Sequence, residues 1–298
     1  MNKIIVIYGP TAIGKTQIAI NLAKIINAEI ISADSMQIYQ DLNIGSAKIM
    51  PDEMQGITHH LLNIKDSLES YSAYDFVCDC KKAIKSIQSK GKNVIICGGT
   101  GLYIKALTEG YNYGDTQKNQ EFREMCKNKT NIELFSIIKE KDITVANNID
   151  INNKHRLIRA LEVLLFGTKQ TKQAFDNDYV IFGLNCDRQK LYDRINKRVD
   201  IMIEQGLLNE TNYLLKHGVT ETHQSFKAIG YKELMPYIRG EANLDSCIDK
   251  LKQNTRNYAK RQITFMNQFP NIIKVEVQDI QQATKQILNQ IEDNKWIN

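Results

Sequence analysis

The sequence predicts an α/β fold in which a parallel sheet is flanked by helices and carries a helical insertion. Three observations support this prediction. Apolar runs such as 4–8 and 93–97 alternate with amphipathic stretches, as in proteins built from β–α–β units. A glycine-rich loop joins the first apolar run to the first amphipathic stretch. From about residue 115 to 178 the chain is rich in Lys, Asn, Gln and Glu and has no strand-like run.

The glycine-rich loop has the spacing of a phosphate-binding P-loop. It consists of Gly9, Pro10, Thr11, Ala12, Ile13, Gly14, Lys15 and Thr16. The glycines let successive N–H groups point into one concavity, and the following helix adds its positive dipole end. Lys15 supplies a cation for a terminal phosphate, and Thr16 supplies a hydroxyl for Mg²⁺. The loop predicts a polyphosphate or pyrophosphate site without defining the ligand.

Two more features are expected near this loop, because the carboxyl ends of parallel strands face the ligand crevice. Asp34 follows the predicted strand 29–33. Its carboxylate could hold Mg²⁺ through water, accept a proton from a nucleophile, or cap a turn. A glycine-rich turn containing Thr100 follows the strand 93–97, where a P-loop NTPase normally has a metal-holding Asp. This difference argues against ATP hydrolysis. Thr100 could bind a ligand, or the turn could serve packing alone.

Basic residues in the second half of the chain are candidate nucleic-acid contacts. A predicted helix at 246–269 carries three cations at a spacing of four, hence on one face: Lys252, Arg256 and Lys260. The start of a predicted helix in the insertion carries His155, Arg156 and Arg159. The loop-like stretch 225–232 combines aromatic residues with lysines, which suits base stacking and phosphate contact. For both helices a solvated charged face is the alternative.

The domains predicted from these patterns are a P-loop core with basic C-terminal helices, at 1–114 and 179–298, and a helical insertion at 115–178. The 298 residues are 42% hydrophobic and 24% charged, as in an ordinary globular protein. With no apolar run of membrane-spanning length, we expect a cytoplasmic protein. We also expect it to be a monomer. The six cysteines form no CxxC pair, which argues against structural zinc. The net charge of +5 permits a nucleic-acid partner but does not require one.

Taken together, these motifs resemble those of the tRNA dimethylallyltransferases, which modify the adenosine just 3′ of the anticodon. Besides the P-loop, the matching segments in chain order are 33–39, 43–48, 59–61, 71–73, 98–103, 156–162, 230–231 and 258–262. The resemblance therefore covers nearly the whole chain. This sequence departs from the family pattern at Ile13, where serine is usual, and at His155, where glutamine is frequent. Lys227 and Lys232 also stand where arginines are frequent.

The resemblance implies transfer of the dimethylallyl group from dimethylallyl diphosphate to the exocyclic N6 amine of that adenosine, at tRNA position 37. The substrates would be tRNAs that read codons beginning with U, and diphosphate would be released. The diphosphate would lie on the P-loop at 9–16, with Mg²⁺ on Thr16. Asp34 would be the general base for the amine, and Thr100 would help to position the amine and the diphosphate. These two are the predicted catalytic residues.

The partner implied by the resemblance is a tRNA anticodon stem-loop, from which one base turns out of the stack to reach Asp34. Gln37 would hydrogen-bond that base. The predicted tRNA-binding residues are Asp34, Ser35, Met36, Gln37, Thr100, Arg123, His155, Arg156, Leu157, Ile158, Arg159, Lys227, Gly230, Tyr231, Lys232, Lys260, Arg261 and Gln262.

Two other functions are compatible with the P-loop. An adenylate isopentenyltransferase that makes a free cytokinin-type nucleotide would share the loop and Asp34. It would need neither the helical insertion nor the basic helix. A P-loop nucleotide kinase or switch would bind ATP or GTP tightly with Mg²⁺.

Overall fold

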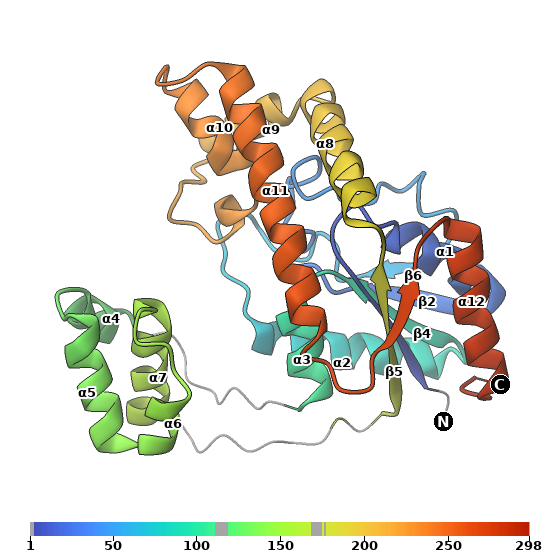
Figure 1. The fold of residues 1–298 in the computed structure, drawn as a ribbon, viewed down its shortest axis with the longest axis horizontal. Helices are drawn as coiled ribbons and strands as arrows, with labels where there is room; N and C mark the ends of the chain where they lie inside the picture. The colour runs from blue at the N-terminus through green and yellow to red at the C-terminus, as the bar shows by residue number, and fades with distance from the viewer. Residues whose placement is uncertain (1–2, 111–118, 168–174, 176, 298) are drawn as a thin grey trace. The chain divides into compact units, whose positions relative to one another are not determined.

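The computed structural model describes residues 3–110, 119–167, 175 and 177–297, and its centre is a six-stranded sheet (Figure 1). All strand pairs are parallel, in the order β3-β2-β4-β1-β5-β6. The strands are β1 (Ile4–Tyr8), β2 (Ala28–Ser32), β3 (His59–His60), β4 (Asn93–Gly98), β5 (Tyr179–Asn185) and β6 (Ile273–Glu276). The central strand β1 pairs with β4 on one side and β5 on the other. This architecture confirms the predicted α/β class.

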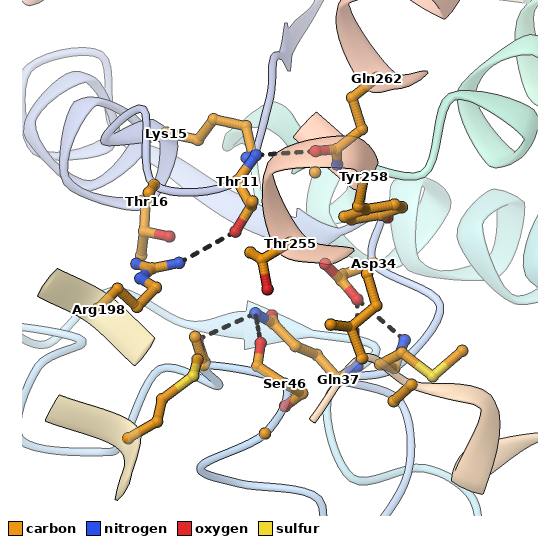
Figure 2. A pocket seen from close by; sticks show the side chains of 18 of the residues that line it. Thr11, Lys15, Thr16, Asp34, Gln37, Ser46, Arg198, Thr255, Tyr258 and Gln262 are labelled. Carbon is orange, nitrogen blue, oxygen red and sulfur yellow. Dashed lines mark hydrogen bonds between the residues drawn. The ribbon is translucent and has the colours of Figure 1, made fainter. Parts of the chain in front are cut away.

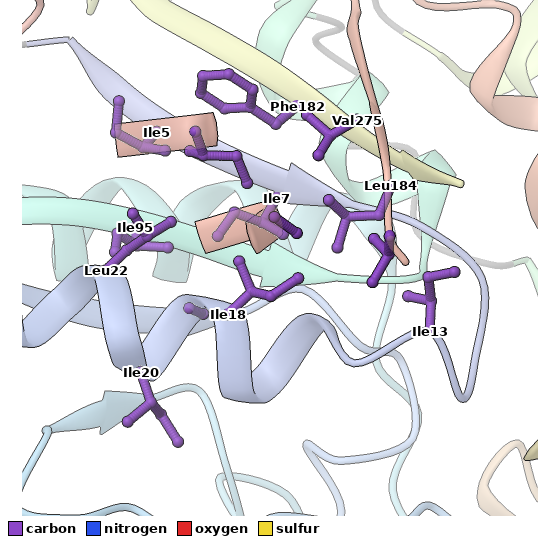
Figure 3. Close-up of a cluster of buried hydrophobic side chains, with 14 of the residues drawn as sticks. Ile5, Ile7, Ile13, Ile18, Ile20, Leu22, Ile95, Phe182, Leu184 and Val275 are labelled. Carbon is purple, nitrogen blue, oxygen red and sulfur yellow. The ribbon is translucent and has the colours of Figure 1, made fainter. Parts of the chain in front are cut away.

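Helices cover both faces of the sheet. On one face lie α1 (Lys15–Ile25) and α12 (Ile280–Asp293), whose apolar side chains join those of the strands in one buried cluster. Figure 3 shows Ile18 and Leu22 of α1 packed towards Ile5, Ile7 and Ile95 of the sheet. On the other side, α2 (Ala73–Ser89) contacts β2 and β4 and packs against α3 (Gly101–Thr108). Among the described helices, none is both long and apolar enough to cross a membrane.

A second group of helices lies beyond the carboxyl ends of the strands (Figure 1). These helices are α8 (Arg188–Glu204), α9 (Leu207–Lys216), α10 (Tyr231–Ile238) and α11 (Leu244–Met266). The long helix α11 packs against α8, α10 and α3, so it connects this group to the sheet layer. The stretch 225–232, predicted to be loop-like, instead contains the 3₁₀ helix η1 (Ser225–Lys227) and the start of α10.

The contacts divide the chain into two compact units, Met1–Thr108 with Phe175–Asn298, and Glu109–Ala174. The second unit contains α4 (Gln120–Lys127), α5 (Asn131–Lys141), α6 (Ile143–Asn147) and α7 (Lys154–Phe166). Its helices surround a small apolar core of their own, which includes Phe122, Leu134 and Leu157. These bounds differ by a few residues from the 115–178 that we predict from composition. Phe175 belongs to the first unit, where its ring lies 5.9 Å from that of Tyr179.

The pair His59–His60 forms the edge strand β3 and thereby reaches a buried carboxylate of β2. Nε2 of His60 lies 2.7 Å from an oxygen of Glu29, whose side chain is 3% exposed. The Nζ atoms of Lys90 and Lys92 also lie close to the Glu29 carboxylate oxygens, at 3.1 and 2.9 Å. Burial opposes ionisation of Glu29, but the hydrogen bonds from Lys92, His60 and Lys90 outweigh it and lower its pKa to about 2.

Glu29→Gln should therefore destabilise the protein by about 2 kcal/mol at neutral pH, since charge-assisted hydrogen bonds to a buried group are lost. The folded-state pKa is depressed, so this stabilisation is complete above the ordinary pKa near 4.5 and disappears as the pH falls towards 2. Urea unfolding at pH 7 and at about pH 3 measures both effects. Glu69→Gln is the control, because its pair with Lys65 is exposed. Equal losses for both variants would contradict the prediction.

Candidate active site

A cavity of about 510 Å³ lies at the carboxyl edge of the sheet, within the first unit (Figure 2). Its walls come from the P-loop, the turn after β2, loop 45–47, α8, η1 and its following residues, and α11. The cavity brings together many of the residues predicted from the sequence: Thr11, Ala12, Gly14, Lys15, Thr16, Asp34, Ser35, Met36, Gln37, Lys227, Lys232, Arg261 and Gln262. The P-loop and the turn that carries Asp34 are thus two sides of one site.

The P-loop has the backbone of an anion-binding turn. Ala12 and Gly14 both have positive φ, 62° and 101°, which changes the direction of successive N–H groups before α1 begins. The positive φ at position 14 favours glycine, and a Cβ there would also lie 2.3 Å from Cδ1 of Ile280, whose side chain would have to shift. The side chain of Ile13 is buried in the core and does not line the cavity. An isoleucine in place of the usual serine therefore leaves only the backbone to contact a ligand.

Two cations face the P-loop from different elements. Nζ of Lys15 donates a hydrogen bond to the Pro10 carbonyl at 2.7 Å, and burial lowers the pKa of Lys15 to about 8. The Arg198 guanidinium comes from α8 and donates to the Thr11 hydroxyl at 3.3 Å (Figure 2). Burial lowers the pKa of Arg198 too, but an arginine stays charged. Partly desolvated cations beside the loop amides favour an anion.

Arg198 is missing from the residues that we predict for the site. Arg194, Lys197 and Arg198 all lie on α8, and the amphipathic periodicity of this stretch does not single one of them out. The packing of α8 against α11 determines which of the three enters the cavity. The available signal was the position of this helix, directly after a strand that pairs with β1.

Asp34 lies in the turn after β2 with one oxygen held and the other free. Its Oδ1 accepts hydrogen bonds from the N–H groups of Met36 at 2.9 Å and Gln37 at 3.4 Å. Within the part of the chain that the structure describes, no hydrogen bond reaches Oδ2. The turn-capping alternative is therefore correct for one oxygen, while the second remains available to a ligand. Figure 2 shows Asp34 across the cavity from Arg198.

Thr100 lies behind this turn and does not line the cavity. Its N–H donates to the Ala33 carbonyl at 3.1 Å, and its hydroxyl accepts from the N–H of Ser35 at 3.0 Å. We predict direct contact of Thr100 with substrate, but the structure makes it a support of the Asp34 turn. The preceding Gly98 is a packing residue as well, since a Cβ there would lie 2.2 Å from the Ala33 oxygen.

Several predicted RNA contacts are buried and already bonded within the chain. Gln262 is 4% exposed; its Oε1 accepts from the Thr11 N–H at 2.8 Å and its Nε2 donates to the Gly99 carbonyl at 2.9 Å. It thus connects the P-loop to the turn after β4. Tyr231 is fully buried and donates to Glu210, and the adjacent Gly230 is also buried. These three residues shape the site: Gly230 and Tyr231 do not line the cavity, whereas Gln262 lines it with an amide that is already bonded within the chain.

The predicted cationic face of α11 is divided. Lys252 pairs with Asp200 at 2.6 Å and Arg256 donates to Asn196 at 2.6 Å, so both serve the packing of α11 on α8. The cations that stay exposed in the first unit include Lys227, Lys232, Lys260 and Arg261. Tyr258 lies in the cavity wall, where burial, together with the charge of Asp34, raises its pKa. Tyr258 and Thr255 also belong to the site, although we do not predict them as site residues.

In the second unit the predicted residues fall into three groups. Arg123 and Arg159 hold the fully buried carboxylate of Glu162, with the closest contacts at 2.6 and 3.1 Å. Leu157 is in the core of the unit and Ile158 packs against that core. His155 and Arg156 are exposed. The exposed pair can reach a partner, whereas the other four residues maintain the unit itself.

The sheet, the loop and the cavity define a P-loop protein of the α/β class. A family model described as IPP transferase matches residues 37–269. The chain is 47% identical over 266 residues to a tRNA dimethylallyltransferase of Streptococcus gordonii, covering 88% of each chain. The chain therefore belongs to the IPP transferase family.

Solved structures show the same relationship. A tRNA isopentenylpyrophosphate transferase from Bacillus halodurans superimposes with a TM-score of 0.76 at 38% identity, covering 98% of this chain and 96% of that one. A eukaryotic dimethylallyltransferase acting on tRNA superimposes with a TM-score of 0.85 at 27% identity, covering 99% of this chain and 79% of that one. The similarity extends over both units of this chain.

Proposed function

We propose that this protein transfers the dimethylallyl group of dimethylallyl diphosphate to the N6 amine of the adenosine 3′-adjacent to the anticodon, in tRNAs that read codons beginning with U. One observation carries the proposal: a single cavity has a P-loop with Lys15 and Arg198 on one side and the free oxygen of Asp34 on the other. An anion site opposite a base suits displacement of diphosphate by an amine. Family membership supports the same reaction.

In the reaction, the bond between the allylic carbon and the diphosphate oxygen breaks while N6 of adenine bonds to that carbon. The P-loop amides, Lys15 and Arg198 stabilise the negative charge that develops on the leaving diphosphate. Oδ2 of Asp34 takes the proton from N6. The exocyclic amine is a poor nucleophile, because its lone pair is delocalised into the ring. General-base help should therefore contribute about 10²- to 10⁴-fold to the rate.

We propose Mg²⁺ as the cofactor, held by the Thr16 hydroxyl together with substrate phosphate oxygens and water. The donor set fits this ion: Thr16 lines the cavity, and the described residues contain no group of three His, Cys, Asp or Glu that would form a cage of its own. Magnesium usually keeps several waters and relies on substrate phosphates. When bound, it would add positive charge beside the leaving diphosphate.

The tRNA is proposed to bind through exposed cations, including Lys227, Lys232, Lys260 and Arg261 around the cavity and His155 and Arg156 in the second unit. A loop base costs less to extrude than a paired one. Gln37 would recognise the extruded adenine with its amide, as amide side chains do in base readout. We also propose that the protein acts as a monomer, since the proposed catalytic groups all lie in one chain, and that it acts in the cytoplasm, since its proposed substrate is a tRNA.

The decisive experiment uses labelled dimethylallyl diphosphate with two competing acceptors, an unmodified tRNA that reads a codon beginning with U, and AMP. We expect label in the tRNA at the adenosine next to the anticodon. Label in AMP instead would favour an adenylate isopentenyltransferase. Calorimetry with ATP and with dimethylallyl diphosphate tests the kinase or switch alternative, which predicts that ATP binds more tightly. Folded protein that labels no tRNA would refute the proposal.

Lys260→Ala should weaken tRNA binding and reduce the slope of log K against log salt by about one unit, because one phosphate contact is lost. Lys260 is exposed, unlike Lys252 and Arg256 on the same helix. Fluorescence anisotropy over a salt series measures the slope. Lys285→Ala, an exposed lysine on α12, is the matched control and should leave it unchanged. An unchanged slope for Lys260→Ala would assign that residue to the solvated surface.

A further inference from the structure

We infer that Glu210 is a positioning residue. It fixes the loop 43–47, which holds the side chain that recognises the acceptor adenine. The inference rests on the proposed function and concerns a residue outside the cavity lining. Glu210 lies on α9, in the helix group beyond the sheet, and it reaches across to the loop 43–47. It acts on the reaction through this loop and Gln37, whose side chain contacts the loop.

The carboxylate of Glu210 is enclosed by backbone donors. It accepts hydrogen bonds from the N–H groups of Asn43 at 3.0 Å, Ile44 at 2.8 Å and Gly45 at 2.9 Å. The Tyr231 hydroxyl donates a fourth at 2.8 Å. Three successive N–H groups converging on one anion form the concave arrangement that binds anions elsewhere. Here a side chain of the protein occupies it, so the loop conformation depends on that carboxylate.

Tyr231 prevents the loop from moving towards α10. Its ring is fully buried, and a Cβ on Gly45 would lie 2.5 Å from the Cζ atom of this ring. The loop backbone therefore packs directly against the aromatic ring. At the far end of the loop, the buried ammonium of Lys48 donates to the Tyr39 carbonyl at 2.6 Å and to Oδ1 of Asn43 at 3.0 Å. The loop is held at both ends without any ligand.

The loop in turn sets the orientation of Gln37. Nε2 of Gln37 lies 3.4 Å from the Ser46 carbonyl and 3.3 Å from the Ala47 carbonyl (Figure 2). Its Oε1 accepts a hydrogen bond from the Ser32 hydroxyl at 3.2 Å. These partners define which end of the amide is the donor. An amide reads adenine only when its donor and acceptor face the right edge atoms. Displacing the two carbonyls would free the amide to rotate, and recognition of the base would weaken.

A double-mutant cycle tests this coupling. We compare the wild type, Glu210→Gln, Gln37→Ala and the double variant, using dimethylallyl diphosphate and unmodified tRNA. Glutamine keeps the size of Glu210 but brings an NH₂ group against the backbone donors. Glu210→Gln should lower kcat/KM for tRNA by about 10- to 100-fold, as expected for lost charge-assisted hydrogen bonds. With Ala at position 37, the same change should cost less than about 3-fold, because coupled residues are not additive.

A second readout separates positioning from general loss of structure. The affinity for a non-reactive thiolo analogue of dimethylallyl diphosphate should change by less than about 2-fold, since residue 210 is not part of the P-loop side. Tyr231→Phe keeps the ring against Gly45 and removes one hydrogen bond to Glu210. In the same cycle it should lower kcat/KM for tRNA by a smaller factor. This variant keeps the test decisive even if Glu210→Gln folds poorly. Glu204→Gln, an exposed glutamate at the end of α8, should behave as wild type.

Two results would overturn the inference: losses that multiply independently in the double variant, or a parallel loss of affinity for the donor analogue. The failure of the proposed function itself would look different. In that case the wild-type protein would not label tRNA at all, before any variant is compared.

Discussion

Replacing Asp34 by asparagine should lower the rate of prenyl transfer by about 10²- to 10⁴-fold while tRNA affinity stays nearly unchanged. Asparagine retains a carbonyl oxygen that can accept the N–H of Met36, the contact that holds the turn at 2.9 Å. Asparagine has an NH₂ group where aspartate has Oδ2, so the basic oxygen is lost. Among the described residues, no protein donor bonds to Oδ2. The loss should therefore appear in the chemical step and not in the shape of the site.

Single-turnover transfer of labelled dimethylallyl groups measures that step, and anisotropy with labelled anticodon stem-loop measures RNA affinity. Asp52→Asn is the matched control, because Asp52 is an exposed acid of the same unit that does not line the cavity. If Asp34→Asn and Asp34→Ala reduced RNA binding as strongly as turnover, Asp34 would be a binding residue and the general-base assignment would be wrong.

The parts of the site that could be predicted from sequence are those specified by neighbouring residues. The P-loop is recognisable because a strand, a glycine spacing and a helix follow each other within about 25 residues, and each has its own local pattern. Asp34 could be placed near it because the carboxyl ends of parallel strands lie at the same edge of a sheet. The parallel order β2-β4-β1 in the structure produces this arrangement.

The parts that could not be predicted depend on packing between distant helices. Arg198 reaches Thr11, 187 residues away, only through the position of α8. Glu210 reaches the loop at Ile44 across 166 residues. A polar residue on an amphipathic helix has the same sequence signal whether it faces solvent, a partner or the chain's own backbone. The same ambiguity explains Gln262 and Tyr231, which match family motifs but have inward-facing side chains.

Replacing Lys15 by alanine should have the second large effect, a loss of about 10²- to 10³-fold in turnover together with weaker binding of dimethylallyl diphosphate. In the proposed reaction Lys15 contacts the leaving group in both the ground state and the transition state, so affinity and rate should fall together. Lys24→Ala on the same helix is the control, since Lys24 is exposed and its ammonium donates a hydrogen bond to the exposed Gln55 side chain. Tight donor binding by Lys15→Ala would exclude Lys15 as the phosphate-binding cation.

The pH dependence of donor binding identifies this cation more sharply. Burial lowers the pKa of Lys15 to about 8 in the free protein, and only the charged form attracts a diphosphate. Donor affinity should therefore be high below pH 8 and decrease by up to tenfold per unit as the pH rises beyond it, with proton uptake on binding. Calorimetry in two buffers of different ionisation enthalpy measures both quantities. Lys15→Arg keeps its charge throughout this range, so it should bind the donor with an affinity that no longer falls above pH 8. A decrease that persists in the arginine variant would come from another group, and the phosphate site would then depend on a residue other than Lys15.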